Sequence, residues 1–165
     1  KTIVLVLNIG EDQIGQETPA TQAFAAYASE HGYTWIALCA KVEAEVAQLD
    51  PQEESEFLEA MGIEEPARNR FIRVCYDSLG LISFFTVGED EVRAWTIRKE
   101  STAVQAAGKI HSDLARGFIR AETLPYERLH EAGSWNAAKE KGYLRLEGKE
   151  YRVQDGDILH IRFQV

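Results

Sequence analysis

An apolar run near the start of the chain constrains its fold more than any other stretch. Residues 3–7 contain no polar side chain, and the run stops at the sequence Asn8-Ile9-Gly10-Glu11. Such a run is typical of a strand that is buried on both faces, as in the middle of a parallel sheet. A central strand needs a neighbouring strand on each side, so the fold must supply two neighbours.

A helix and a second strand follow this run. Thr18 and Pro19 form a favourable N-cap and first helical residue, and Gly32 is a favourable residue at a helix end. The next apolar stretch, residues 34–39, predicts a second buried strand. The order strand, helix, strand predicts a βαβ unit with parallel strands.

Three further helices are predicted before residue 80, over residues 41–49, 51–61 and 67–79. The second begins at the capping sequence Asp50-Pro51-Gln52-Glu53. The third carries one apolar stripe that should face a core; it consists of Phe71, Ile72, Val74, Cys75 and Leu79. Cys39 and Cys75 have no metal-site or redox spacing, and we interpret them as buried free thiols.

The pattern changes after Gly80. Strands are predicted over residues 81–87 and 91–99, joined by a tight turn at residues 88–90, which makes a β-hairpin. A helix over residues 102–116 and a strand over residues 118–123 come next. Short helices (125–132 and 134–141) and short strands (143–146, 151–153 and 158–165) complete the chain. This order predicts an α+β domain of the β-grasp, ubiquitin-like type.

Charge supports a boundary near Gly80. Residues 1–79 hold 5 Lys or Arg and 14 Asp or Glu, and so account for the whole net charge of −9. Residues 80–165 hold 13 of each kind. The first half should repel nucleic acid, whereas the second could carry a local basic patch. We expect two domains, 1–79 and 80–165, in a monomeric cytoplasmic protein without a membrane-spanning segment or DNA-specific readout.

The second half resembles a known family at the level of long sequence blocks. The segments LGLISFFTVGEDEVRAWTIRK, QAAGKIHSDLARGFIRAET and LEGKEYRVQDGDILHIRFQV resemble the TGS domain of the YchF family, the Obg-like ATPases among the TRAFAC P-loop NTPases. The segment FLEAMGIEEPARNRFIRVCYDSLGL resembles what precedes TGS there. Glu100 and Val104 depart from the family pattern, which more often has Gly and Pro.

The resemblance implies a site at the ends of the first two strands. In that family the chain first makes a P-loop domain, and a strand like residues 3–7 then returns to its sheet. The missing neighbours would therefore precede Lys1, and this chain would be a C-terminal fragment. The resemblance implies an Asn-x-x-Glu base loop that binds ATP or GTP, with a preference for ATP. It also implies a second base-contacting loop, Cys39-Ala40-Lys41, after the next strand. The base-binding residues here would be Asn8, Ile9, Glu11, Cys39 and Ala40.

Phosphate binding and catalysis are not expected of this chain alone. The sequence contains no GxxxxGK[ST] motif, whose backbone and Lys hold the phosphates. We therefore expect the whole protein to bind nucleotide with Mg²⁺ and act as an ATPase, whereas this fragment should be inactive and need no cofactor. Without the resemblance, Asn8 to Glu11 would be interpreted as a polar strand exit. His111 and Asp113 offer too few ligands for a metal site.

A second candidate site lies on the predicted β-grasp sheet. In the last strand Leu159, Ile161 and Phe163 alternate with polar residues, so the polar set should face solvent. An open basic face could contact RNA phosphates; its candidates are Arg93, Arg98, Arg120, His160 and Arg162. The alternative is an ordinary solvated face. The family resemblance implies the ribosome or ribosomal RNA as partner.

Two other functions compete with this interpretation. One is a stand-alone regulatory or RNA-binding TGS module with no nucleotide role. The other is a ubiquitin-like carrier, which would end in Gly-Gly; this chain ends Phe163-Gln164-Val165, so we set the carrier hypothesis aside.

Overall fold

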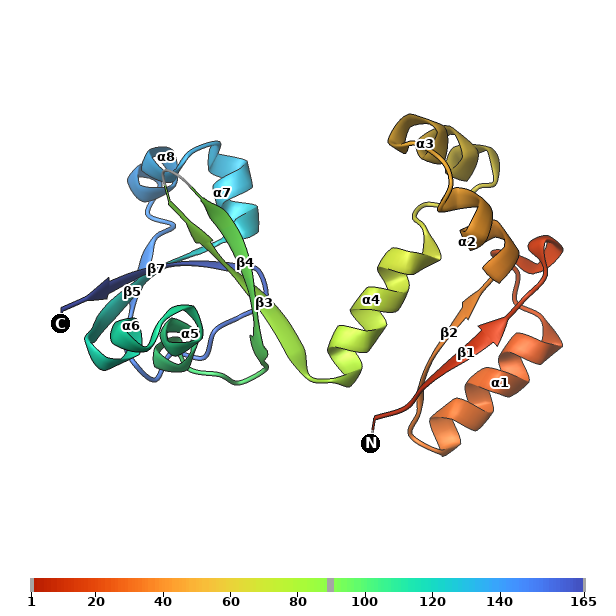
Figure 1. Cartoon of the computed structure of the whole chain (residues 1–165), viewed down its shortest axis with the longest axis horizontal. Coiled ribbons are helices and arrows are strands. Elements are labelled where there is room, and N and C mark those ends of the chain that lie inside the picture. The colour runs from red at the N-terminus through yellow and green to blue at the C-terminus, as the bar shows by residue number, and fades with distance from the viewer. Residues whose placement is uncertain (1, 89–90, 165) are drawn as a thin grey trace. The chain divides into compact units, whose positions relative to one another are not determined.

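A computed structural model describes residues 2–88 and 91–164 of the chain. The chain divides into two compact units, residues 1–79 and 80–165, and each unit has its own sheet (Figure 1). In the described part of the chain, no helix is both long and apolar enough to cross a membrane.

The first unit is built on a parallel pair of strands. β1 (Val4–Asn8) and β2 (Thr34–Leu38) pair in parallel from Val4↔Thr34 to Asn8↔Leu38. The crossover helix is α1 (Pro19–Glu30), and the Thr18 hydroxyl caps it by accepting from the Thr21 N–H at 3.2 Å. The predicted βαβ unit and its helix start are therefore confirmed.

Four more helical segments complete the first unit: η1 (Glu11–Gln13), α2 (Ala40–Val46), α3 (Pro51–Ala60) and α4 (Ala67–Ser78). Asp50 caps α3 as predicted, accepting from the N–H groups of Gln52 and Glu53. Helices α1 and α4 lie on opposite faces of the strand pair (Figure 1). The core of this unit is a cluster of Cys39, Val42, Val46 and Leu58.

Two predictions about burial in the first unit are wrong. β1 is not buried on both faces, because Val6 is 46% exposed, and in the described chain β1 pairs only with β2. The α4 stripe is also partly open, with Ile72 51% and Leu79 52% exposed, since only part of the helix surface contacts β1 and β2. Cys39 is buried as expected, whereas Cys75 is only half-buried.

The second unit is built on a mixed sheet of five strands in the order β4-β3-β7-β5-β6. The strands are β3 (Leu81–Val87), β4 (Val92–Arg98), β5 (Phe118–Pro125), β6 (Arg145–Glu147) and β7 (Asp157–Phe163). β3 is antiparallel to β4 and parallel to β7, while β5 is antiparallel to β6 and β7. The predicted hairpin is confirmed, but Glu89 and Asp90 of its turn lie outside the described residues.

Four helices accompany the sheet in the described part of the second unit. They are α5 (Ala103–Ile110), α6 (Ser112–Arg116), α7 (Tyr126–Ala132) and α8 (Trp135–Glu140). Ala106 of α5 joins a buried cluster with Ile82, Phe84 and Leu159 from the sheet. The small alanine side chains let the helix approach the strands closely, which gives this unit a close-packed core.

Three predictions for the second unit need correction. The helix predicted over residues 102–116 is broken at His111, whose extended backbone (φ −160°, ψ 143°) separates α5 from α6. Residues 151–153 form no strand, because only the isolated bridge Thr102↔Arg152 pairs this segment. Phe163 was expected in the core but is 47% exposed, since the strand end runs beyond the clusters that fill the core.

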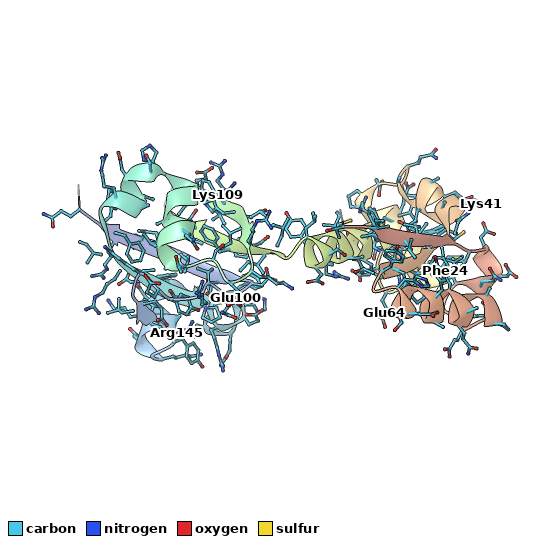
Figure 2. All side chains as sticks on the ribbon, turned by 90° about the horizontal axis from the view of Figure 1, so that it is seen from below. Phe24, Lys41, Glu64, Glu100, Lys109 and Arg145 are labelled. Atoms are coloured by element: carbon cyan, nitrogen blue, oxygen red, sulfur yellow. The ribbon has the colours of Figure 1, made fainter. Side chains whose placement is uncertain are left out.

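Two local features of the second unit matter below. The Asp157 carboxylate is 2% exposed, and it accepts from the Tyr151 hydroxyl at 2.8 Å and the Gln154 N–H at 2.9 Å. Burial, together with this hydrogen bond, raises the pKa of Tyr151 well above its usual range. Glu100, labelled in Figure 2, has φ +67° in the turn between β4 and α5, the left-handed region that favours glycine.

Candidate functional site

The loops that follow β1 and β2 are joined by a hydrogen bond between distant residues. The Asn8 Oδ1 atom accepts from the Ala40 N–H at 3.0 Å, and the Ile9 N–H donates to the Leu38 carbonyl at 2.9 Å. Because both loops leave the carboxyl ends of parallel strands, they reach the same edge of the sheet. The Asn8 side chain therefore holds two predicted base loops in a fixed relation.

A pocket of about 340 Å³ lies between these loops. Its lining consists of Asn8, Ile9, Gly10, Glu11, Asp12, Cys39 and Lys41. Four of the five residues proposed from the sequence thus share one pocket. The fifth, Ala40, contributes the N–H that Asn8 binds. Ile9 also packs against the cluster around Cys39, so much of its side chain serves the core.

Lys41 and Glu11 form an ion pair at the mouth of this pocket. Their Nζ and Oε1 atoms are 2.7 Å apart, and the two side chains are 69% and 43% exposed. The hydrogen bond to Glu11, reinforced by that charge, raises the pKa of Lys41. Figure 2 labels Lys41 among the exposed side chains of this unit. The pair places a hydrogen-bond donor directly beside an acceptor.

Sequence reasoning did not propose Asp12 as a site residue. Asp12 follows the Asn-x-x-Glu sequence directly and lies in η1, the short helical turn that begins at Glu11. The available signal was simple adjacency to a proposed loop residue. Lys41 ends the second expected loop, Cys39-Ala40-Lys41, and it lines the same pocket.

A second pocket of about 290 Å³ lies beside the first and shares Ile9 and Cys39 with it. Glu43 lines this pocket and caps α4, because its carboxylate accepts from the Ala67 N–H at 2.8 Å and the Arg68 N–H at 3.1 Å. The carboxylate thereby joins α2 to the start of α4.

His111 and Asp113 have a structural role at the start of α6. The Asp113 N–H donates to the His111 Nδ1 atom at 3.2 Å, and the Asp113 carboxylate accepts from Arg116 at 2.7 Å. Within residues 2–88 and 91–164, no group of three or more His, Cys, Asp or Glu is placed to hold a metal ion. The histidine therefore acts as a helix cap.

The proposed basic residues of the second unit do not gather into one patch. In the register of β5 and β7, Arg120 lies opposite Arg162, and Glu122 lies opposite His160. These four side chains therefore share one face of the two strands. Arg162 forms an ion pair with Glu122, which neutralises part of this face.

Arg93 and Arg98 are placed differently from the expectation. Arg93 pairs with Thr86 on the opposite face, where its guanidinium lies 4.2 Å from the centre of the Trp95 ring. Arg98 shares the face of Arg162 by register, but it lies about eight residues further along the strand direction, roughly 25 Å away. Strand alternation and strand length thus separate both residues from Arg120 and Arg162.

Comparison with known proteins places the chain in a family. A family model described as "YchF-GTPase_C: Protein of unknown function (DUF933)" matches residues 81–164, about half of the chain. The chain belongs to the YchF family. The resemblance inferred from the sequence is thereby confirmed.

Relatives in the YchF family match this chain throughout. The protein named "Ribosome-binding ATPase YchF" of Bacillus subtilis is 48% identical over the whole chain, and that of Escherichia coli O157:H7 is 43% identical. The chain spans less than half of their length, 46% and 45% respectively. It therefore corresponds to only part of such a protein.

Solved structures agree with this placement. The Schizosaccharomyces pombe YchF GTPase matches 98% of the chain with a TM-score of 0.84 at 30% identity, and the match covers 43% of that protein. A GTP-binding protein from Pyrococcus horikoshii matches 98% of the chain with a TM-score of 0.65 at 21% identity, and covers 45% of its own chain. The second match supports the mixed α/β fold alone.

Proposed function

We propose that this chain is the C-terminal part of a ribosome-associated, ATP- or GTP-binding YchF protein, with the nucleotide base held in the pocket between the loops that follow β1 and β2. The observation that carries the proposal is the hydrogen bond from the Ala40 N–H to Asn8, which joins the two loops across that pocket. The open edge of β1 and the exposed Val6 are consistent with further strands supplied by the rest of such a protein.

The Lys41–Glu11 pair can hydrogen-bond a purine base. A carboxylate is an acceptor only and an ammonium group is a donor only, so the pair presents one of each. Adenine offers a donor beside an acceptor on its Watson–Crick edge, and guanine offers two donors beside an acceptor there. The pair could therefore contact either base.

The phosphates and Mg²⁺ would be held by residues outside this chain. The sequence contains no GxxxxGK[ST] loop, and the electrostatic stabilisation that phosphoryl transfer requires would come from that loop and its metal ion. The contribution of this chain is to orient the base and to link the nucleotide-binding part to the second unit. Alone, it should not hydrolyse ATP.

The base site can be tested on the full 165-residue chain by NMR. AMP and GMP, each added to about 10 mM because binding without phosphate contacts should be weak, are titrated against the ¹⁵N-labelled chain. Both nucleotides should shift the amides of residues 8–12 and 39–41. Glu11→Gln or Lys41→Met should reduce these shifts, whereas Glu59→Gln on exposed α3 should not. Shifts confined to other residues would rule out this base site.

We propose further that the second unit is a β-grasp TGS domain that contacts the ribosome or RNA through the face of β5 and β7. Arg120, His160 and Arg162 are exposed there. Replacing Arg120 and Arg162 by Ala should weaken co-sedimentation with ribosomes, most clearly at low salt. Arg93→Ala is the matched control, because Arg93 lies on the other face. Equal co-sedimentation of all variants would reject this contact face.

A further inference from the structure

The sheet of the second unit opens between β3 and β7. The two strands pair at a single position, Phe85↔Ile158, although β3 continues to Val87 and β7 to Phe163. On its other side, β7 stays paired with β5 from Asp157 to Phe163. Figure 1 shows β3 and β7 diverging. Beyond Ile158, no residue of β7 pairs with β3 in the described chain.

Main-chain groups of β7 point into this opening. The Gln164 N–H, just after the end of β7, donates to the Gly117 carbonyl at 2.9 Å, so the main chain of Gln164 points toward β5. Main-chain groups alternate in direction along a strand. The N–H and C=O groups of Ile161 and Phe163 consequently point toward the β3 side, where no described strand pairs with them.

A cavity of about 350 Å³ occupies the opening. It is lined by Thr86, Val87, Gly88, Glu91 and Trp95 of the hairpin, Ile110 and Leu114 of the helices, and Leu159, His160 and Ile161 of β7. The Trp95 indole N–H is already satisfied by the Thr86 hydroxyl at 2.9 Å. The Arg93 guanidinium covers one face of the ring, and the rest of the ring offers apolar surface. Apolar side chains are also exposed beside the cavity, with Val87 40% and Val92 70% exposed.

Charge at the opening favours a basic occupant. Glu91 is in the lining, and it closes the acidic turn sequence Gly88-Glu89-Asp90-Glu91. Among the described residues, the lining includes no Lys or Arg. RNA would need cationic groups for its phosphates, so the cavity is poorly suited to nucleic acid. A polypeptide with Lys or Arg near Glu91 would be complementary to it.

We propose that this opening binds an extended, basic segment of a protein partner, which adds to the free edge of β7 as an extra strand. Main-chain hydrogen bonds to Ile161 and Phe163 would supply affinity, and the cavity would take alternate apolar side chains, as in other complexes formed by strand addition. The proposed site uses neither the loops of the first unit nor the Arg120–Arg162 pair, and so goes beyond the function proposed above.

Amide hydrogen exchange of the full chain, followed by NMR, tests the free edge. In the free chain the amides of Ile161 and Phe163 should exchange faster than those of His160 and Arg162, which bond to β5. The probe is an acetylated and amidated heptapeptide, KVTVTVK, at about 1 mM. It should slow exchange at Ile161 and Phe163 by about tenfold, the effect of one or two hydrogen bonds, and should shift the indole resonance of Trp95.

Two methylated peptides separate strand addition from apolar adsorption. One carries N-methyl groups on its three valines and the other on its two threonines. Each peptide therefore loses the N–H donors of one edge, which the methyl groups also block sterically, and keeps its side chains. One of the two should fail to bind and the other should bind as the parent does. Glu91→Gln should weaken binding severalfold at low salt, whereas Glu150→Gln, an exposed acid of the same unit, should not.

Four outcomes would overturn the proposal. The Ile161 amide could be as protected as the Arg162 amide in the free chain, which would mean that the edge is already filled. The parent peptide could fail to bind, or both methylated peptides could bind equally well. Finally, a single-stranded oligouridine could give the same protection at Ile161 and Phe163, which would assign the opening to RNA.

Discussion

The Asn8 side chain holds the two loops of the proposed base site together. Its Oδ1 atom is the acceptor for the Ala40 N–H, 32 residues away in the chain. Asn8→Ala should lower the free energy of unfolding by about 1 kcal/mol, the usual net value of such a bond, and should speed exchange of the Ala40 amide. Urea denaturation and NMR measure the two effects.

Asn8→Asp is the matched control for this prediction, because the acceptor oxygen is kept. It should retain most of the stability and the protection of the Ala40 amide. If the alanine variant keeps wild-type protection at Ala40, the hydrogen bond does not hold the two loops together in solution.

The family resemblance singled out Asn8, Glu11 and Cys39, and the strand ends explain why they share one pocket, because parallel strands bring their carboxyl-terminal loops together. The same reasoning could not place Arg93. Whether a hairpin residue faces a core or solvent depends on the register, and a shift of one residue reverses every side chain. Nor could it find Glu122 as the partner of Arg162, because the two are far apart in the chain.

At the scale of elements, Glu43 links α2 to α4 across the first unit. Its carboxylate accepts from the N–H groups of Ala67 and Arg68. N–H groups at the start of a helix have no partner within the helix. Glu43→Ala should reduce the free energy of unfolding by about 1–2 kcal/mol, as expected for loss of a helix cap. Glu43→Gln keeps one acceptor oxygen, so its loss of unfolding free energy should be about half as large. Equal losses in the two variants would show that the charge of Glu43, and not its capping hydrogen bonds, matters. Urea denaturation at neutral pH measures both.

Tyr151 gives the second unit a pH-dependent contribution to its stability. Because the pKa of Tyr151 is raised in the folded chain, folding favours the protonated hydroxyl. This contribution is fully present below the unfolded pKa of about 10 and is lost as pH rises from there toward the folded pKa.

Tyr151→Phe should therefore remove the part of the fall in unfolding free energy above about pH 10 that this residue causes. The substitution should also lower the free energy of unfolding at neutral pH by about 1–3 kcal/mol, because it removes a hydrogen-bond donor from the buried Asp157 carboxylate. Urea denaturation at pH 7 and pH 11 measures both effects. An unchanged alkaline decline in the variant would assign the decline to other groups.

Local signals decided which elements could be predicted. The caps at Thr18 and Asp50 and the glycines after helices set most boundaries of the first unit to within a few residues. The break at His111 was missed because the apolar spacing runs through it, and the side chain that caps α6 is a histidine, an uncommon N-cap. The 151–153 segment has a strand-like composition, but only one bridge pairs it.

For the whole molecule, each hydrophobic cluster lies within one unit. Phe84, which is fully buried, packs with Ile82, Ile97 and Leu159 of the second unit. Phe84→Ala should lower the free energy of unfolding by about 3–5 kcal/mol, the usual loss when a buried aromatic side chain is truncated. Hydrogen exchange should accelerate across the second unit first. Val46→Ala, in the cluster of the first unit, is the reciprocal variant. Uniform acceleration in both variants would mean that the units unfold as one.

The step in charge near Gly80 coincides with the division between the units. The second neighbour predicted for the first strand could not be found in the sequence, since the described chain supplies only β2 as a partner for β1. A pattern of residues indicates how much burial a strand needs, but not which part of a protein supplies it.

The left-handed backbone of Glu100 has an evolutionary consequence. A side chain with a Cβ atom is disfavoured there by about 1 kcal/mol, while glycine has no such penalty. Among relatives of this chain, glycine and then asparagine should be the commonest residues at the aligned position, and β-branched residues should be nearly absent. At Glu100 this chain accepts a less stable turn, which a glycine at the same position would relieve.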